Sequence, residues 1–174
     1  MKNEPWEILP DEEEKAVWDI INSEFHFNPS GKADKTFTFP FEVNCYDIDY
    51  QKCDNNPEFD EIVKNIFREC MGNDEWMYAL DWQHTCFHYN PRVKDENEYP
   101  VFHEDKRYDG DGYEIYFPEF YPNGDFYFFI AKDLSWGWLG HPWKAKVWIY
   151  GKNLRNLIEK NAERLGLTLT DNEQ

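Results

Sequence analysis

Three segments of the chain repeat their apolar residues at the spacing of an amphipathic helix, which buries one stripe of side chains. The first covers residues 10–25, and the acidic residues of its first turn complement the helix dipole. The second begins at Pro57 and is predicted to end at Gly72, because glycine readily takes the backbone angles of a helix C-cap. The third carries its stripe over residues 154–165 and is predicted to end at Gly166.

Other segments alternate apolar and polar residues with the period of two that is typical of β-strands. An Asn123-Gly124 pair, which is a strong signal for a hairpin turn, separates two of them. Residues 109–112 have the composition of a second turn. The predicted strands cover residues 36–48, 76–89, 113–117, 126–131 and 143–150, with a further short strand at 99–103.

The order of these elements is helix, strand, helix, a series of strands and a final helix. Consecutive strands with hairpin-type links predict an α+β fold, with a largely antiparallel sheet and helices packed on one face. The sequence contains no internal repeat and no linker-like stretch. We therefore expect a single domain over residues 1–174, with a disordered tail at about 170–174.

The composition is that of a chain with a sizeable core. Of its 174 residues, 41% are hydrophobic and 19% aromatic, which suffices for folding without disulfides or metals. No run of 18 apolar residues and no apolar leader occurs, which predicts a cytoplasmic protein without a membrane span. Because no cysteine pair has CxxC spacing, we expect four reduced thiols, two or three of them in the core. These are Cys45, Cys53, Cys70 and Cys86.

The formal net charge of −17 is distributed unevenly along the chain. Residues 141–174 contain six Lys/Arg and four Asp/Glu, so the first 140 residues carry −19. Such a surface repels nucleic-acid phosphates and anionic lipids, which predicts that the protein binds no nucleic acid directly and no membrane. The charge allows a basic protein partner, but it is also explained more simply as a means of keeping an aromatic-rich chain soluble.

The first candidate for chemistry is the set His84, Cys86 and His88, which share one face of the second long predicted strand. With a further ligand such as His103 or His141 they could bind a metal, but their spacing differs from that of structural zinc sites. A partly buried polar patch is favoured, and we predict no metal and no cofactor. Cys86 could also pair with either histidine as a nucleophile, although same-face neighbours on a strand lie about 6–7 Å apart.

The second candidate is a segment rich in glycine and proline, residues 137–143, which holds His141 and Trp143. Its composition fits equally a ligand-contacting loop and a tight connection whose aromatic side chains cap the core. Asp125, next to the Asn-Gly pair, could anchor the turn or face a site, and the turn role is favoured. Residues 109–112 lack the remaining ligands of an EF-hand loop, which favours a turn over a calcium site.

Four motifs form the most specific ordered set in the chain: residues 78–84 (YALDWQH), 89–91 (YNP), 122–129 (PNGDFYFF) and 140–143 (GHPW), followed by Gly151. As a set they resemble the bacterial family called domain of unknown function 2716, over a region from Trp18 to the last predicted helix. The resemblance implies a bacterial protein and no particular activity. An aromatic residue is more usual in that family where this chain has His88, which weakens the metal hypothesis. The resemblance marks seven candidates for ligand or partner binding: Asp81, Trp82, Gln83, His84, Asp125, His141 and Trp143.

Two classes of function follow from these observations. The charge distribution, the surplus of aromatic residues and the lack of a recognised catalytic motif favour a non-catalytic binding or interaction protein, of immunity or regulatory type. The alternative is an enzyme or small-ligand binder with a polar and aromatic cleft around His84 and His141. This alternative requires both histidines to line one cleft, with perturbed pKa values.

Overall fold

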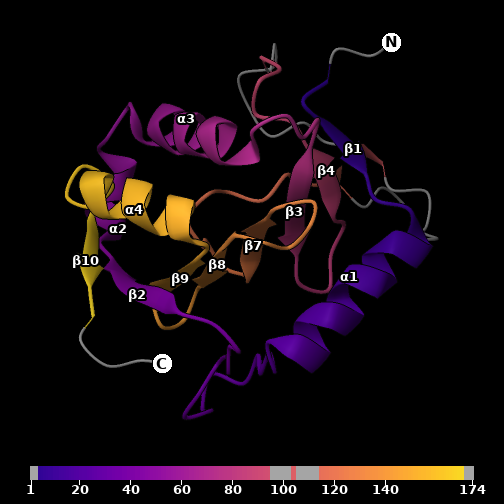
Figure 1. Cartoon of the computed structure of the whole chain (residues 1–174), viewed down its shortest axis with the longest axis horizontal. Helices are drawn as coiled ribbons and strands as arrows, with labels where there is room; N and C mark the ends of the chain where they lie inside the picture. Colours follow the sequence, from indigo (N-terminus) through magenta and orange to yellow (C-terminus); the bar gives the residue numbers. More distant parts are fainter. Residues whose placement is uncertain (1–3, 95–102, 105–113, 171–174) are drawn as a thin grey trace.

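The computed structural model describes residues 4–94, 103–104 and 114–170, and its centre is an eight-stranded sheet (Figure 1). Every neighbouring pair of strands is antiparallel, so the α+β class with a largely antiparallel sheet is confirmed. A separate two-stranded sheet joins β5 (His103–Glu104) and β6 (Glu114–Ile115). Across the large sheet the order is β1 (Trp6–Ile8), β4 (Phe87–Tyr89), β3 (Met77–Asp81), β7 (Tyr127–Ile130), β8 (Gly137–His141), β9 (Lys146–Tyr150), β2 (Val43–Ile48) and β10 (Leu167–Leu169).

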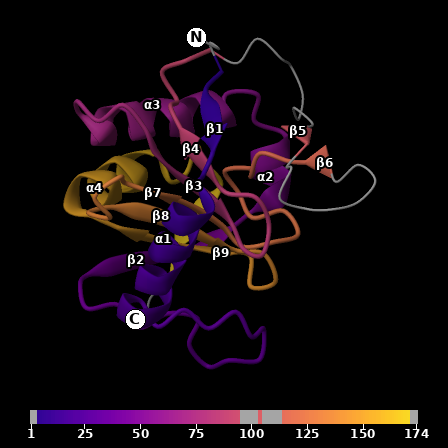
Figure 2. The same cartoon turned by 90° about the vertical axis from the view of Figure 1, so that its right-hand side faces the viewer.

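The sheet is covered on both faces, because successive side chains of a strand point to opposite sides. Phe129 of β7 stacks on Phe67 of helix α3 (Phe59–Met71), with ring centroids 5.6 Å apart. The preceding residue, Phe128, contacts Trp18 of helix α1 (Asp11–Glu24), also at 5.6 Å. Helix α4 (Lys152–Asn161) packs beside α3, and Figure 2 shows α1 in front of the strands. Helices α3 and α4 therefore share one face as expected, whereas α1 corrects that expectation by covering the other.

The three predicted helices are present with small changes at their ends. Helix α1 begins directly after Pro10 with four acidic residues. Helix α3 buries the predicted apolar stripe and ends at Gly72, whose φ of +56° glycine adopts without strain. Helix α4 ends at Asn161, earlier than predicted, and the chain passes through Gly166 at φ +63° into β10. The pattern did not predict a further short helix, α2 (Tyr50–Asp54), whose N-cap is Asp49.

The predicted long strand over residues 76–89 is wrong, because the chain folds back on itself within it. Strand β3 ends at Asp81, the chain turns, and β4 returns antiparallel from Phe87. Gln83 in the turn has φ +64°, and the His84 N–H donates to the Asp81 carbonyl at 3.2 Å. His84, Cys86 and His88 consequently do not share a strand face.

Three further strand predictions are corrected by pairing between distant segments. Only Val43–Ile48 of the predicted strand 36–48 is extended, and Phe37 and Phe39 instead stack on each other at 5.0 Å outside the sheet. The Asn123-Gly124 turn does not join a hairpin, because β7 pairs with β3 and β8 while β6 pairs with β5. Residues 137–141, expected to be a loop, form strand β8 in the middle of the sheet.

Some expectations concern other parts of the chain. All four cysteines are free thiols, three of them buried, which confirms the predicted thiols. Within the ranges that the structure describes, no helix is long and apolar enough to cross a membrane. The predicted turn at 109–112 and the end of the predicted tail, residues 171–174, lie outside the described residues, as does most of the predicted strand 99–103.

Gly137 makes the central sheet sensitive to a single methyl group. A Cβ at this position would overlap the ring of Tyr150, whose Cζ would lie 2.9 Å away. That ring cannot easily move, because its hydroxyl donates to the Leu134 carbonyl at 3.1 Å. We expect Gly137→Ala to lower the free energy of unfolding by about 1–3 kcal/mol through overpacking, measured by urea denaturation.

Gly31→Ala is the matched control. A Cβ on Gly31 would meet only the Trp143 ring at 3.3 Å, and that ring is largely exposed, so it has room to move toward solvent. We expect a change below about 0.5 kcal/mol. Equal destabilisation by both variants would contradict the packing argument.

Candidate functional site

The segment immediately before β7 brings the candidate residues together. Asp125 lies 3.1 Å from the His84 ring, between its Oδ2 and the imidazole Nδ1. The adjacent Phe126 ring contacts Trp82, His141 and Trp143, with centroids 5.5, 4.6 and 5.4 Å away. Asp125 and Phe126 therefore contact residues of the β3–β4 turn and residues at and just after the end of β8. Gln83, another of the seven candidates, is an exposed residue of the β3–β4 turn.

Asp81, His84 and Asp125 form a compact group that we call the carboxylate–histidine cluster. The Nδ1 atom of His84 lies 3.0 Å from Oδ1 of Asp81 and 3.1 Å from Oδ2 of Asp125. Only 9% of the Asp81 side chain is exposed, compared with 60% of the His84 side chain. A buried carboxylate and a half-buried one thus share a single imidazole nitrogen.

The cluster has perturbed proton affinities. Burial raises the pKa of Asp81 to about 7, helped by the charge of Asp125 and opposed by His84. Partial burial works to lower the pKa of His84, but the two carboxylates outweigh it and the pKa is raised. Burial also raises the pKa of Asp125, against hydrogen bonds from the Phe126 N–H and His84. The pKa values of all three groups are therefore raised, so each carboxyl group ionises less readily than an exposed one.

His141 lies in a different environment from His84. Its side chain is fully buried, and its ring packs against Phe126 and Trp148. The Lys144 N–H donates to its Nδ1 at 3.3 Å, and among the described residues its Nε2 has no hydrogen-bond partner. Burial, with a contribution from Lys144, lowers the pKa of His141 to about 4. The neutral imidazole therefore serves as a packing group at the end of β8.

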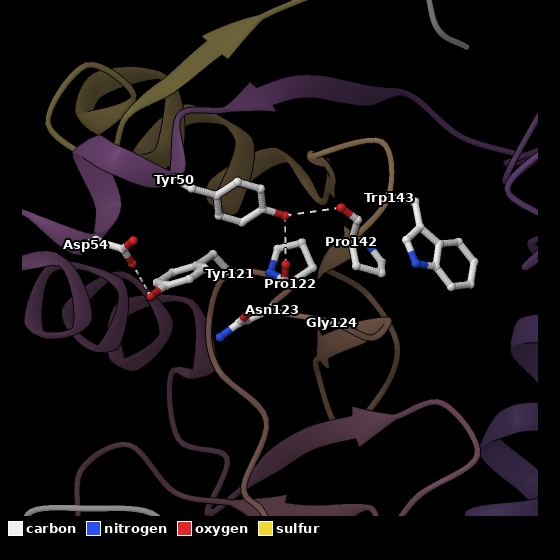
Figure 3. A pocket seen from close by; sticks show the side chains of 8 residues that line it. All are labelled: Tyr50, Asp54, Tyr121, Pro122, Asn123, Gly124, Pro142 and Trp143. Carbon is white, nitrogen blue, oxygen red and sulfur yellow. Dashed lines mark hydrogen bonds between the residues drawn. The ribbon is translucent and has the colours of Figure 1, made fainter.

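Residues 121–124, in the segment before β7, also help to line a pocket of about 310 Å³ (Figure 3). We call it the aromatic pocket. Helix α2 forms one wall, the segment before β7 forms the base, and the β8–β9 turn ends the pocket with Trp143, which is 62% exposed. It is lined by Tyr50, Asp54, Tyr121, Pro122, Asn123, Gly124, Pro142 and Trp143.

Hydrogen bonds fix the walls of the aromatic pocket. The Tyr50 hydroxyl lies 2.7 Å from the Pro122 carbonyl and 3.4 Å from the Pro142 carbonyl, and so links α2 to both other segments (Figure 3). The Tyr121 hydroxyl donates to Asp54 at 2.6 Å. The sequence pattern did not reveal α2, so it did not indicate Tyr50 and Asp54 of that helix or Tyr121, which bonds to Asp54. Asp49 was the available signal, since its side chain caps α2 by accepting from the Lys52 N–H.

The structure does not support the nucleophile pairs considered from the sequence. Cys86 is fully buried, its Sγ lies 3.5 Å from the Asp81 carbonyl, and burial raises the pKa of its thiol to about 12. His88 points elsewhere, with its Nε2 2.9 Å from Glu13 and its ring against Trp76. A thiol that stays protonated and lacks an adjacent imidazole is not an activated nucleophile.

The environment of His141 has a measurable consequence. Its pKa in the folded protein lies below the value of about 6.5 in an unfolded chain. The resulting stabilisation is present above pH 6.5 and is lost as the pH falls towards 4, because the unfolded state then binds the extra proton. We expect the side-chain nitrogen signals of His141 in long-range ¹H–¹⁵N spectra to stay those of a neutral ring down to about pH 5. A midpoint near 6.5 would contradict the buried, neutral assignment.

Comparisons with known proteins agree with the motif resemblance. No solved structure matches the chain significantly. The uncharacterized protein YxiI of Bacillus subtilis (strain 168) is 28% identical over 169 residues, which cover 90% of this chain and 93% of YxiI. The family model described as "Protein of unknown function (DUF2716)" matches residues 8–155, a region that contains both the carboxylate–histidine cluster and the aromatic pocket. The chain belongs to the DUF2716 family.

Proposed function

We propose that this protein is a non-catalytic binding protein, of immunity or regulatory type, whose partner is a basic protein. In this proposal the aromatic pocket receives a lysine or arginine side chain of the partner. The observation that carries the proposal is the composition of the pocket, which combines an exposed indole, two tyrosine rings and a carboxylate in one small hollow.

The aromatic side of the pocket suits a cation. Trp143 lines the pocket and is the most exposed of the large hydrophobic residues that the structure describes. Its ring is therefore accessible to a group that enters the pocket. The face of an indole attracts an ammonium or guanidinium group, and the attraction contributes about 0.5–2 kcal/mol depending on burial. Exposed tryptophan is also enriched at protein interfaces, where it contributes much of the binding free energy. Trp143 is therefore the proposed anchor.

The opposite side of the pocket carries one carboxylate, Asp54, and two further acidic residues that do not line the pocket, Glu119 and Asp60, lie near it. Burial, together with the neighbouring charges of Asp60 and Asp54, raises the pKa of Glu119. Burial also raises the pKa of Asp60, because Lys64 only partly offsets it. Carboxyl groups with raised pKa values are destabilised as anions, and a cation bound nearby would relieve that destabilisation. The α2 side of the pocket would thus favour a positively charged group.

The overall charge favours the same class of partner. The first 140 residues carry −19, and this region supplies Asp54, Asp60 and Glu119. Complementary charge accelerates the encounter of two proteins and selects against anionic partners. The volume of about 310 Å³ lies at the lower end of ligand pockets, which suits one side chain better than a large cofactor.

The alternative, an enzyme or small-ligand binder centred on His84 and His141, has less support. The aromatic pocket is lined by neither histidine. His141 is fully buried, whereas 60% of the His84 side chain is exposed. A shared cleft was the feature that this alternative required, so the binding protein is the function we put forward.

The proposal is tested with fluorescein-labelled nonapeptides rich in arginine or lysine, with acidic peptides as probes of opposite charge. We expect the basic peptides to bind and the acidic peptides not to bind, and we expect the affinity for the basic peptides to fall with added salt. Trp143→Ala and Asp54→Asn should each weaken binding by about fivefold or more, because each removes a cation contact worth about 1 kcal/mol. Fluorescence anisotropy measures the dissociation constants.

Two matched variants separate pocket binding from general charge attraction. Glu7→Gln removes an exposed carboxylate from strand β1, whose residues do not line the pocket, and should leave the affinity nearly unchanged. Trp143→Phe keeps an aromatic face and should retain most of the binding. If Trp143→Ala and Asp54→Asn bind the basic peptides as tightly as the unaltered protein, the proposed role of the pocket is wrong.

A further inference from the structure

The geometry points to a binding site for one divalent transition-metal ion, such as Zn²⁺ or Mn²⁺, formed by Asp81, His84 and Asp125. This inference is independent of the proposed partner and departs from the expectation that the protein has no metal site. The corner of the fold that holds the exposed His84 imidazole would then be a metal centre.

Three potential ligand atoms converge in this cluster. Oδ1 of Asp81, Nδ1 of His84 and one carboxylate oxygen of Asp125 all lie within 4.8 Å of one another, and the two contacts to Nδ1 measure 3.0 and 3.1 Å. Bonds of about 2.0–2.2 Å from a metal to nitrogen and oxygen place neighbouring ligand atoms about 3 Å apart. The two contacts to Nδ1 therefore already have about the spacing that a bound ion requires.

The two carboxylates of the cluster share a single imidazole nitrogen, which leaves room for a cation between the three groups. An imidazole Nδ1 carries at most one hydrogen, yet here it faces two carboxylate oxygens. Asp81, with a side chain only 9% exposed, has little water to satisfy it. A divalent ion in place of that single hydrogen would bind all three atoms at once and neutralise both carboxylates. Mixed carboxylate and imidazole ligands suit zinc, manganese and iron.

The backbone fixes the two carboxylates. Asp81 pairs with Tyr127 in the β3–β7 ladder, and the Trp82 N–H donates to the Phe126 carbonyl at 3.1 Å. The Phe126 N–H donates to Oδ1 of Asp125 at 2.7 Å, while the other oxygen, Oδ2, faces His84. Hydrogen bonding to the second oxygen of a ligand is the arrangement that holds metal-binding carboxylates in position.

The remaining coordination positions would be open. Because 60% of the His84 side chain is exposed, a hydrated ion can reach the cluster and retain water on the outer side. Three protein ligands with open positions are typical of exchangeable or catalytic sites, whereas structural zinc sites have four.

The chain contains a matched site for comparison. His88 and Glu13 form the same type of histidine–carboxylate contact, at 2.9 Å. Among the described contacts, the His88 ring meets one carboxylate, that of Glu13, whereas the His84 ring meets two. The Tyr78 hydroxyl also donates to Glu13 at 3.0 Å. This pair should bind no metal, so it controls for histidine and acid content alone.

The test uses the full chain, freed of metal with a chelator and titrated with Zn²⁺ and with Mn²⁺ by calorimetry at physiological ionic strength. We expect one ion per chain. His84→Ala and Asp125→Asn should weaken binding by about tenfold or more, whereas Glu13→Gln should not change it. Asp81 is left intact because its burial makes a substitution there more disruptive, and circular dichroism with thermal melts checks that each variant folds.

A spectroscopic measurement identifies the ligand directly. During a Zn²⁺ titration, long-range ¹H–¹⁵N spectra should show the Nδ1 signal of His84 shifting, with those of His88 and His141 unchanged. Absence of saturable binding would overturn the inference. So would binding that persists in both His84→Ala and Asp125→Asn, because the ion would then be held by the acidic surface in general.

Discussion

Burial of both faces of the central strands is the constraint on which the rest of the structure depends. Strands β3 and β8 are buried along their whole length, and β7 and β9 nearly so. Strand β7 meets this constraint with large apolar side chains at successive positions, Phe128 and Phe129, which contact α1 on one face and α3 on the other. The high aromatic content follows from this, since two separate cores must be filled with helices on either side.

The same packing explains why polar groups collect where strands end. Inside the sheet there is no water to accept a carboxylate or an imidazole, so such groups gather at the ends of β3 and β8 and just before β7. Asp81 is the last residue of its strand, and His141 is the last of its own. Burial disfavours the charged form of each group, so it raises the pKa of the Asp81 carboxyl and lowers the pKa of the His141 imidazole.

One segment, residues 121–126, serves both proposed sites. Its first four residues line the aromatic pocket, Asp125 belongs to the carboxylate–histidine cluster, and Phe126 packs between Trp82, His141 and Trp143. Occupation of either site would be felt through this short stretch of backbone, which the β3–β7 ladder holds at one end. The two sites are adjacent yet face different ligands, because tyrosines and Trp143 shape one and ionisable groups shape the other.

The class of fold, the three longer helices and the reduced thiols can be predicted from the sequence, because amphipathic stripes and composition are local properties. The sequence also singled out Asp81, His84, Asp125 and His141 through their motifs, but wrongly placed His84 on one strand face with Cys86 and His88. Alternation of side chains cannot distinguish one long strand from a tight hairpin, which is why residues 76–89 were predicted as continuous. Helix α2 has only five residues, too few for a helical repeat of apolar positions, so the sequence did not predict the aromatic pocket that it lines. Only the pairing of β3 with β7, between residues nearly 50 positions apart, decided which carboxylates meet the imidazole, since register is fixed by long-range packing rather than local pattern.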